Sequence, residues 1–163
     1  MHDPARASEA DEARLVEISA ALADAIVEHL PGWVHRSIAE VATQAGQLSR
    51  QLEMAAIEAG QAAVADLEPK LRDLLATDID EQTTTPLSLV RSAVRYPTQA
   101  LRNAGVPPPH RPDFDVDAFP EDTYGLTPAN FAAVHADLHQ PGLEWGAAKA
   151  FVHLRRREAE GRV

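Results

Sequence analysis

Apolar residues recur every three or four positions along most of this chain, which is the spacing of one face of an α-helix. The first such stretch begins near Asp11, and its apolar face comprises Leu15, Ile18, Leu22, Ala25, Ile26 and Leu30. We expect Pro31-Gly32 to end this helix, because proline cannot continue the hydrogen-bond ladder and glycine tolerates the turn. Residues 1–11 show no such period and are predicted to be a disordered tail.

A second, longer helix is predicted from residue 33 to about residue 66. Its apolar positions alternate steps of four and three residues and form a heptad-like seam over residues 34–62 (Val34, Ile38, Val41, Ala45, Leu48, Leu52, Ala55, Ala59 and Ala62). Gly46 and Gly60 each cost a helix about 1 kcal/mol relative to alanine, so a break at either position stays open. Pro69 predicts a kink or a fresh start.

The second half of the chain predicts shorter helices separated by prolines. Thr85-Pro86 and Thr127-Pro128 each combine a capping threonine with proline at the first helical position. We expect the first of these helices to kink at Pro97, and the second to stop at Pro141-Gly142. A last helix over about 143–158 would bury Ala147, Phe151 and Leu154.

These patterns predict an all-α fold. It is a helical hairpin or bundle built on one long helix, with an irregular, proline-rich segment at 106–126 and two short C-terminal helices packed on it. No stretch shows the alternation of a half-buried strand.

Charge divides the chain into two regions. Residues 1–82 hold 6 Lys/Arg against 16 Asp/Glu, whereas residues 83–163 hold 9 of each, so the whole net charge of −10 lies in the first half. Beyond the tail we therefore distinguish an acidic helical region, 12–82, from a neutral one, 83–163. An acidic surface repels phosphate backbones, which makes nucleic acid an unlikely partner of the first half, and an accessory role on nucleic acid through the second half alone is a third, weaker interpretation.

Composition removes several classes of protein. The absence of cysteine excludes disulfides, thiolate metal sites and cysteine nucleophiles. No apolar run approaches the roughly 20 residues that span a bilayer, and the N-terminus lacks the features of a secretory signal. We expect a cytoplasmic protein, and the excess of arginine over lysine together with the abundant alanine is typical of bacteria with GC-rich genomes.

Two histidines are candidate metal ligands. His135 and His139 lie four residues apart in a stretch predicted to be helical, which would place both imidazoles on one face. A zinc site needs a third ligand, and neither His153, which shares its face with cations, nor Asp137, predicted to point away from His135, supplies it well. An imidazolium near a helix C-terminus explains His139 without a metal, so we predict no cofactor.

The acidic run at 113–117 resembles the start of a calcium-binding loop. Such a loop needs glycine at its sixth position and glutamate at its twelfth, where this chain has Ala118 and Tyr124. We interpret this run as a solvated acidic loop.

Three arginines are candidates for contact with an anion or a partner. Arg91, Arg95 and Arg102 fall on one side of the same predicted helix, and guanidinium groups hold phosphates and carboxylates well. They can equally pair with the acidic first half of the chain or with residues 113–117, and internal pairing is the interpretation we favour.

Two functions are the main candidates for this chain. The first is a helical protein–protein interaction module (a scaffold, adapter or regulatory subunit) that associates with itself through the 34–62 seam or with another protein. The alternative is a small-ligand or metal-binding bundle, possibly enzymatic, with its site in the C-terminal half. No known catalytic motif is present, so we name no catalytic residue, although an active site assembled from distant residues stays open.

Overall fold

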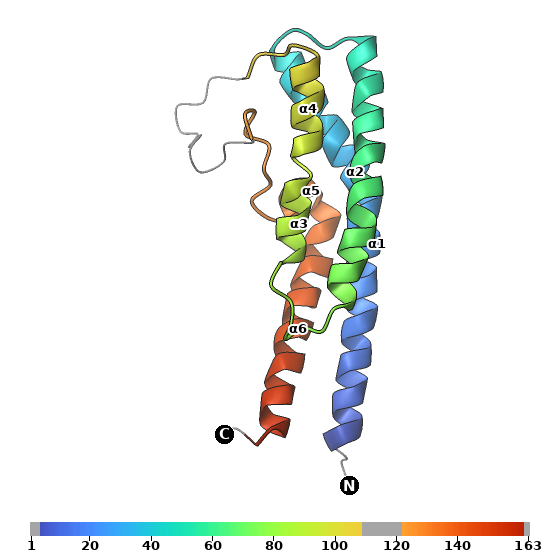
Figure 1. Ribbon diagram of the computed structural model, residues 1–163, viewed down its shortest axis with the longest axis vertical. Helices are drawn as coiled ribbons and strands as arrows, with labels where there is room; N and C mark the ends of the chain where they lie inside the picture. The colour runs from blue at the N-terminus through green and yellow to red at the C-terminus, as the bar shows by residue number, and fades with distance from the viewer. Residues whose placement is uncertain (1–3, 109–121, 162–163) are drawn as a thin grey trace.

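The protein is all-α, as predicted. The computed structural model describes residues 4–108 and 122–161, and in these ranges it contains helices and no strand. The helices are α1 (Pro4–Gln44), α2 (Arg50–Ala76), α3 (Pro86–Ser92), α4 (Arg95–Asn103), α5 (Phe131–Val134), the 3-10 helix η1 (Ala136–Leu138) and α6 (His139–Ala159) (Figure 1). None of these helices is both long and apolar enough to span a membrane.

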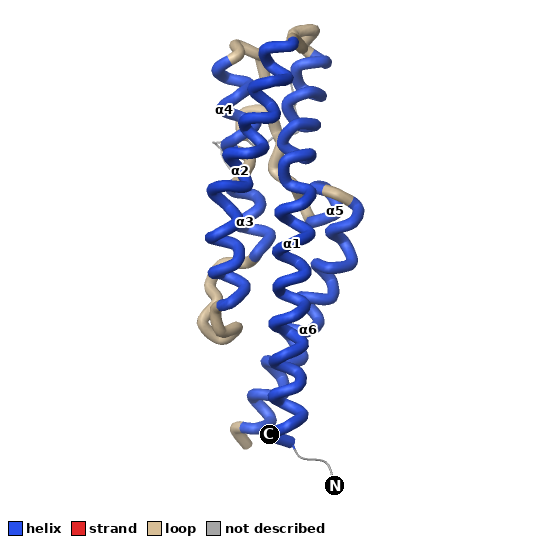
Figure 2. Tube along the Cα trace, turned by 90° about the vertical axis from the view of Figure 1, so that its right-hand side faces the viewer, coloured by secondary structure: helices blue, strands red, loops and turns tan. Residues whose placement is uncertain are grey.

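Helix α1 is the axis of the molecule, about 60 Å long at the usual helical rise. Helices α2, α3 and α4 lie on one side of it, and α5 and the first part of α6 lie on the other (Figure 2). Helix α2 packs along the upper part of α1, and α6 packs along the lower part (Figure 1). The lower part of α1 and the end of α6 thus form a two-helix extension, here called the arm.

Helix α1 does not end at Pro31, contrary to the prediction. It continues from Pro4 to Gln44 and so also extends back into the predicted tail. Leu30, Trp33 and Val34 are buried on either side of the proline, and this packing holds the helix together despite the lost hydrogen bond.

The long helix predicted over 33–66 is interrupted at its first glycine. Residues 45–49 form a turn in which Gly46 has a φ of +67°, a conformation that favours glycine. Ser49 then caps α2, because its hydroxyl accepts a hydrogen bond from the Leu52 N–H at 3.1 Å.

This turn changes the role of the heptad-like seam. Val34, Ile38 and Val41 lie on α1, Leu52 lies on α2, and all four are buried in the hairpin core of one chain. These four residues of the seam are covered within one chain, whereas Leu48 and Ala62 are exposed, and association of two copies through the 34–62 seam stays a prediction.

The next two prolines also act differently from expectation. Helix α2 runs through the exposed Pro69 to Ala76 without a fresh start. The helix predicted after Thr85 is divided at Ala93–Val94, ahead of Pro97, which occupies the first turn of α4.

The C-terminal helices also begin and end at other residues than predicted. Asn130, and not Thr127, caps the short α5, its side chain accepting the Ala133 N–H at 2.9 Å. Helix α6 runs through Pro141-Gly142 where a stop was predicted. It buries Trp145 and Val152, whereas the predicted core residues Phe151 and Leu154 are 45% and 55% exposed.

The segment before α5 is anchored by two buried side chains. The Asp122 carboxylate accepts hydrogen bonds from the N–H groups of Leu126 and Thr127 and from the Thr127 hydroxyl. The buried Tyr124 hydroxyl donates to the Val106 carbonyl at 2.6 Å. The acidic run at 113–117 lies outside the described residues.

Candidate functional site

The predicted ligands His135 and His139 do not share a helical face. His135 has an extended backbone, with φ −162° and ψ 142°, between α5 and η1, while His139 is the exposed first residue of α6. The premise of a shared helix was therefore wrong, although His135 belongs to a different group.

That group joins His135 to His29 of α1 and Asp137 of η1, and we call it the histidine cluster. The two imidazole rings stack with centroids 3.8 Å apart and planes inclined by 16°. The Asp137 Oδ2 atom lies 3.4 Å from His29 Nε2 and 3.6 Å from His135 Nδ1. One potential ligand atom from each residue lies within 4.8 Å of the others.

The local backbone explains how the cluster is assembled. His135 leaves the helical conformation, so its ring turns back to α1, and its Nδ1 accepts the Asp137 N–H at 3.0 Å. The Arg36 guanidinium donates to the Val134 carbonyl at 2.7 Å and fastens the α5–η1 junction to α1. Sequence reasoning missed His29, because nothing in its own helix marks it as the neighbour of residue 135.

The three candidate arginines are held by three different parts of the chain. Arg91 donates to the carbonyls of Pro128 and Ala129, Arg95 to the Asp66 carboxylate, and Arg102 to the Thr123 hydroxyl. Each guanidinium has a partner within the chain, so the three do not form a joint anion site in this structure. A role in partner contact stays a prediction.

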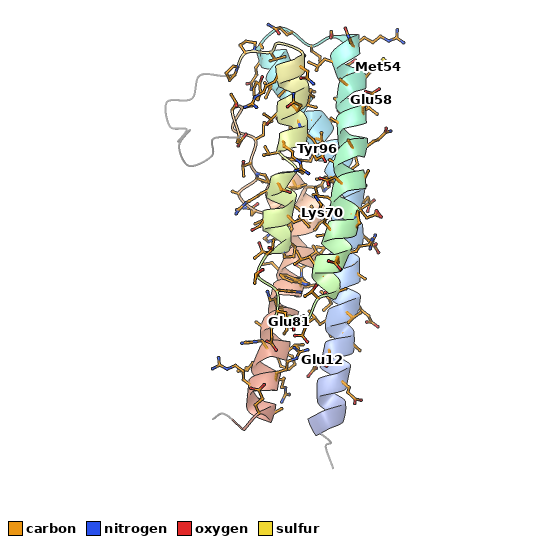
Figure 3. The ribbon with its side chains drawn as sticks, viewed as in Figure 1. Glu12, Met54, Glu58, Lys70, Glu81 and Tyr96 are labelled. Atoms are coloured by element: carbon orange, nitrogen blue, oxygen red, sulfur yellow. The ribbon has the colours of Figure 1, made fainter. Side chains whose placement is uncertain are left out.

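A groove between α2 and α4 has a volume of about 620 Å³. Its floor is made of alanines from both helices (Ala55, Ala59, Ala62, Ala100 and Ala104), with glutamine and asparagine amides around them. Tyr96 lies between α4 and α2, and Glu58 of α2 also lines the groove, whereas Met54 projects from α2 away from the other helices (Figure 3). Glu58 and Tyr96 are the titratable residues of its lining, and the Tyr96 hydroxyl donates to the Asp66 carboxylate at 2.7 Å.

The second candidate surface is a row of apolar residues on the outer side of α6. Leu143, Ala147, Ala150 and Leu154 are all exposed and follow steps of four, three and four residues, with Phe151 beside them. We call these five residues the α6 stripe. An exposed heptad seam of this kind is the usual contact surface of one helix on another.

Beside the stripe, α1 and α6 enclose a groove of about 400 Å³. Phe151 lies on its α6 side and Ile18 on its α1 side, with Asp11, Arg14 and Glu144 around them. The arm therefore presents apolar side chains surrounded by charges of both signs.

The comparisons with known proteins add no relative. The chain matches no family model, and neither a curated protein nor a solved structure is significantly similar to it.

Proposed function

We infer that this protein is a helical protein–protein interaction module, of the scaffold, adapter or regulatory-subunit kind, and that its α6 stripe pairs two copies of the chain. The observation that supports the proposal most directly is the exposure of large apolar side chains in a heptad pattern: Leu143 is 56% exposed and Leu154 is 55% exposed. A two-helix arm leaves such a face uncovered, and a second pair of helices would complete a four-helix bundle.

The order of residues in the stripe favours a two-fold arrangement. Leucine, alanine, alanine and leucine occupy the four heptad positions, so the stripe is the same in both directions. An antiparallel pairing would set Leu143 against Leu154 of the partner subunit and bring the alanines together at the centre. Such a self-complementary contact is what a two-fold axis requires.

The charges on α6 fit the same arrangement. Glu144 lies near the start of the stripe and Arg155 near its end. An antiparallel pairing brings Glu144 close to the end of the partner helix that carries arginine, so the pairs that form are attractive.

The expected affinity is modest. Leu143, Phe151 and Leu154 are each about half exposed, so completing their burial contributes about 1 kcal/mol per side chain. Three such side chains from each of two subunits contribute about 6 kcal/mol of binding free energy. This corresponds to a dissociation constant between about 1 μM and 1 mM, before the entropy lost on association is subtracted. The dimer should therefore form at high protein concentration and dissociate on dilution.

Sedimentation velocity over a concentration series tests this proposal. We expect a reversible shift from monomer to dimer in the wild-type chain, and monomer throughout in the double variant Phe151→Glu, Leu154→Glu. Ile57→Glu is the matched control, because Ile57 is a comparably exposed apolar residue (53%) on α2, outside the arm. A wild-type chain that stays monomeric, or a dimer that the control loses and the double variant keeps, contradicts the proposal.

The histidine cluster favours the second candidate function, a metal-binding bundle. Two imidazoles and a carboxylate from separate segments are brought within ligand distance, as argued below.

A further inference from the structure

We propose that His29, His135 and Asp137 bind one divalent transition-metal ion of the zinc class. This site goes beyond the interaction function and is independent of it, since it involves none of the residues of the α6 stripe.

The donor set determines the class of ion. Imidazole nitrogens suit zinc and its first-row neighbours, whereas magnesium and calcium prefer oxygen ligands alone. Two histidines and one carboxylate are a usual three-residue set for zinc or iron(II), with water in the remaining positions. Asp137 is exposed and His135 partly exposed, so an ion and its waters can reach the cluster from solvent.

The distances already match a coordination sphere. In a tetrahedral zinc site with bonds of about 2.0–2.1 Å, neighbouring ligand atoms lie about 3.3–3.4 Å apart. The Asp137 Oδ2 atom lies 3.4 Å from His29 Nε2 and 3.6 Å from His135 Nδ1. Two of the three edges of the ligand triangle are thus within a few tenths of an ångström of the required length.

One hydrogen bond must be exchanged when an ion binds at His135. Its Nδ1 accepts the backbone N–H of Asp137 at 3.0 Å, so the single lone pair of this nitrogen is engaged until the ring turns toward the ion. The carboxylate oxygen 3.6 Å away is also an acceptor, and the distance is too long for a hydrogen bond. An ion bound between Nδ1 and this oxygen would give both acceptors a cation in place of that hydrogen bond.

Binding also requires a change in ring orientation. The lone pairs of an imidazole lie in its ring plane, so two rings stacked at 3.8 Å with a 16° inclination direct their lone pairs within two nearly parallel planes, and one ion cannot lie in both. His29 is fixed in the middle of α1, whereas His135 lies at the junction of α5 and η1. Coordination would therefore tilt the His135 ring out of the stack, while Arg36 keeps the preceding backbone attached to α1.

Isothermal titration of the full chain with ZnCl₂ tests the site. We expect one ion per chain, and an affinity weakened by at least about tenfold in His29→Ala, His135→Ala and Asp137→Asn, since even outer-shell changes have that effect at zinc sites. His139→Ala is the matched control, because His139 lies just outside the cluster and is exposed. The Phe151→Glu, Leu154→Glu variant should bind zinc normally, which separates this site from the proposed dimer.

Circular dichroism first establishes that each variant is folded. Should His29→Ala fail to fold, imidazole-detected NMR on the wild-type chain replaces it, with zinc expected to shift the ring signals of His29 and His135 and to leave His139 and His153 unchanged. The proposal is overturned if the wild-type chain does not bind zinc, if the cluster variants bind like the wild type, or if His139→Ala weakens binding as much as they do.

Discussion

At Gly60, a missing methyl group decides how closely the two longest helices approach each other. A Cβ atom at this position would lie 3.1 Å from the Pro31 Cα and carbonyl oxygen, which is tighter than normal packing. Gly60 is buried within α2, and its neighbour is the backbone of a 41-residue helix that cannot easily yield.

We therefore expect Gly60→Ala to lower the free energy of unfolding by about 1 kcal/mol, although alanine is normally the better helix former. Gly146→Ala in α6 is the control, since a Cβ there meets nothing within 4 Å, and it should raise the free energy of unfolding by about 0.5–1 kcal/mol. Urea denaturation measures both changes. Equal stabilisation by the two substitutions would show that α1 and α2 are not in close contact at Gly60.

Single residues were the hardest features to predict from the sequence. Pro31 was predicted to end a helix, because proline removes a hydrogen bond from its own helix. Its contact with Gly60 could not be predicted, because that contact depends on how α1 and α2 pack against each other. His29 and His135 are separated by 105 intervening residues, so no spacing rule could pair them. Of the two threonines predicted to cap helices, Thr85 caps α3 as expected, whereas Asn130 takes the place of Thr127 at α5.

At the scale of elements, Asp66 fastens α2 to α4. Its carboxylate accepts hydrogen bonds from the Tyr96 hydroxyl at 2.7 Å and from Arg95, and it pairs with Lys70 at 2.9 Å in its own helix. Lys70, followed by Tyr96 and Arg95, lowers the pKa of Asp66 from 3.8 to about 2.

A lowered pKa means that the folded protein favours the ionised carboxylate more than the unfolded chain does. The stabilisation from Asp66 is therefore complete above its ordinary pKa of 3.8 and is lost as the pH falls through about 2. We expect Asp66→Asn to lower the free energy of unfolding by about 1–2 kcal/mol near neutral pH, and by much less at about pH 2.

Denaturation of both proteins at several pH values measures this difference. Asp73→Asn, which changes an exposed carboxylate of the same helix, is the control and should change stability little at any pH. A penalty for Asp66→Asn that is constant down to pH 2 would count against the role of the ionised carboxylate.

Helix existence was predictable and helix ends were not. The buried residues of α1 and α2 recur every three or four positions, as predicted, because this spacing arises when one face of a helix is buried. The second half of the chain was less predictable, since α6 has two apolar faces and only packing selects the one with Trp145 and Val152. The exposed α6 stripe is the face that the sequence alone assigned to the core.

For the whole molecule, Arg156 ties three distant segments together. Its guanidinium donates to Glu12 of α1 at 2.7 Å, to Asp78 at 2.6 Å and to Asp80 at 3.0 Å in the loop after α2. The hydrogen bond that Arg156 donates to Asp78, followed by those to Glu12 and Asp80, raises the pKa of Arg156. The acidic first half of the chain thus finds part of its counter-charge in the second half.

We expect Arg156→Gln to lower the free energy of unfolding by about 1–2 kcal/mol at low salt and to increase amide exchange in the arm. The difference from wild type should shrink in about 1 M NaCl, because salt screens partly exposed charges. Arg157→Gln removes the neighbouring, exposed charge and should have little effect on either measurement. Equal effects of the two substitutions would indicate that net charge, and not this network, stabilises the arm.

The position of the arm also has a consequence for the order in which the protein is assembled. The α1–α2 hairpin joins residues on either side of a short turn, whereas the arm joins Glu12 to Arg156, which are 144 positions apart. Local contacts form before distant ones, and at about 5–20 residues per second a ribosome needs roughly 7–30 s to make the chain between them. We therefore expect the lower part of α1 to lack its contact with α6 during synthesis, after the α1–α2 hairpin has already folded.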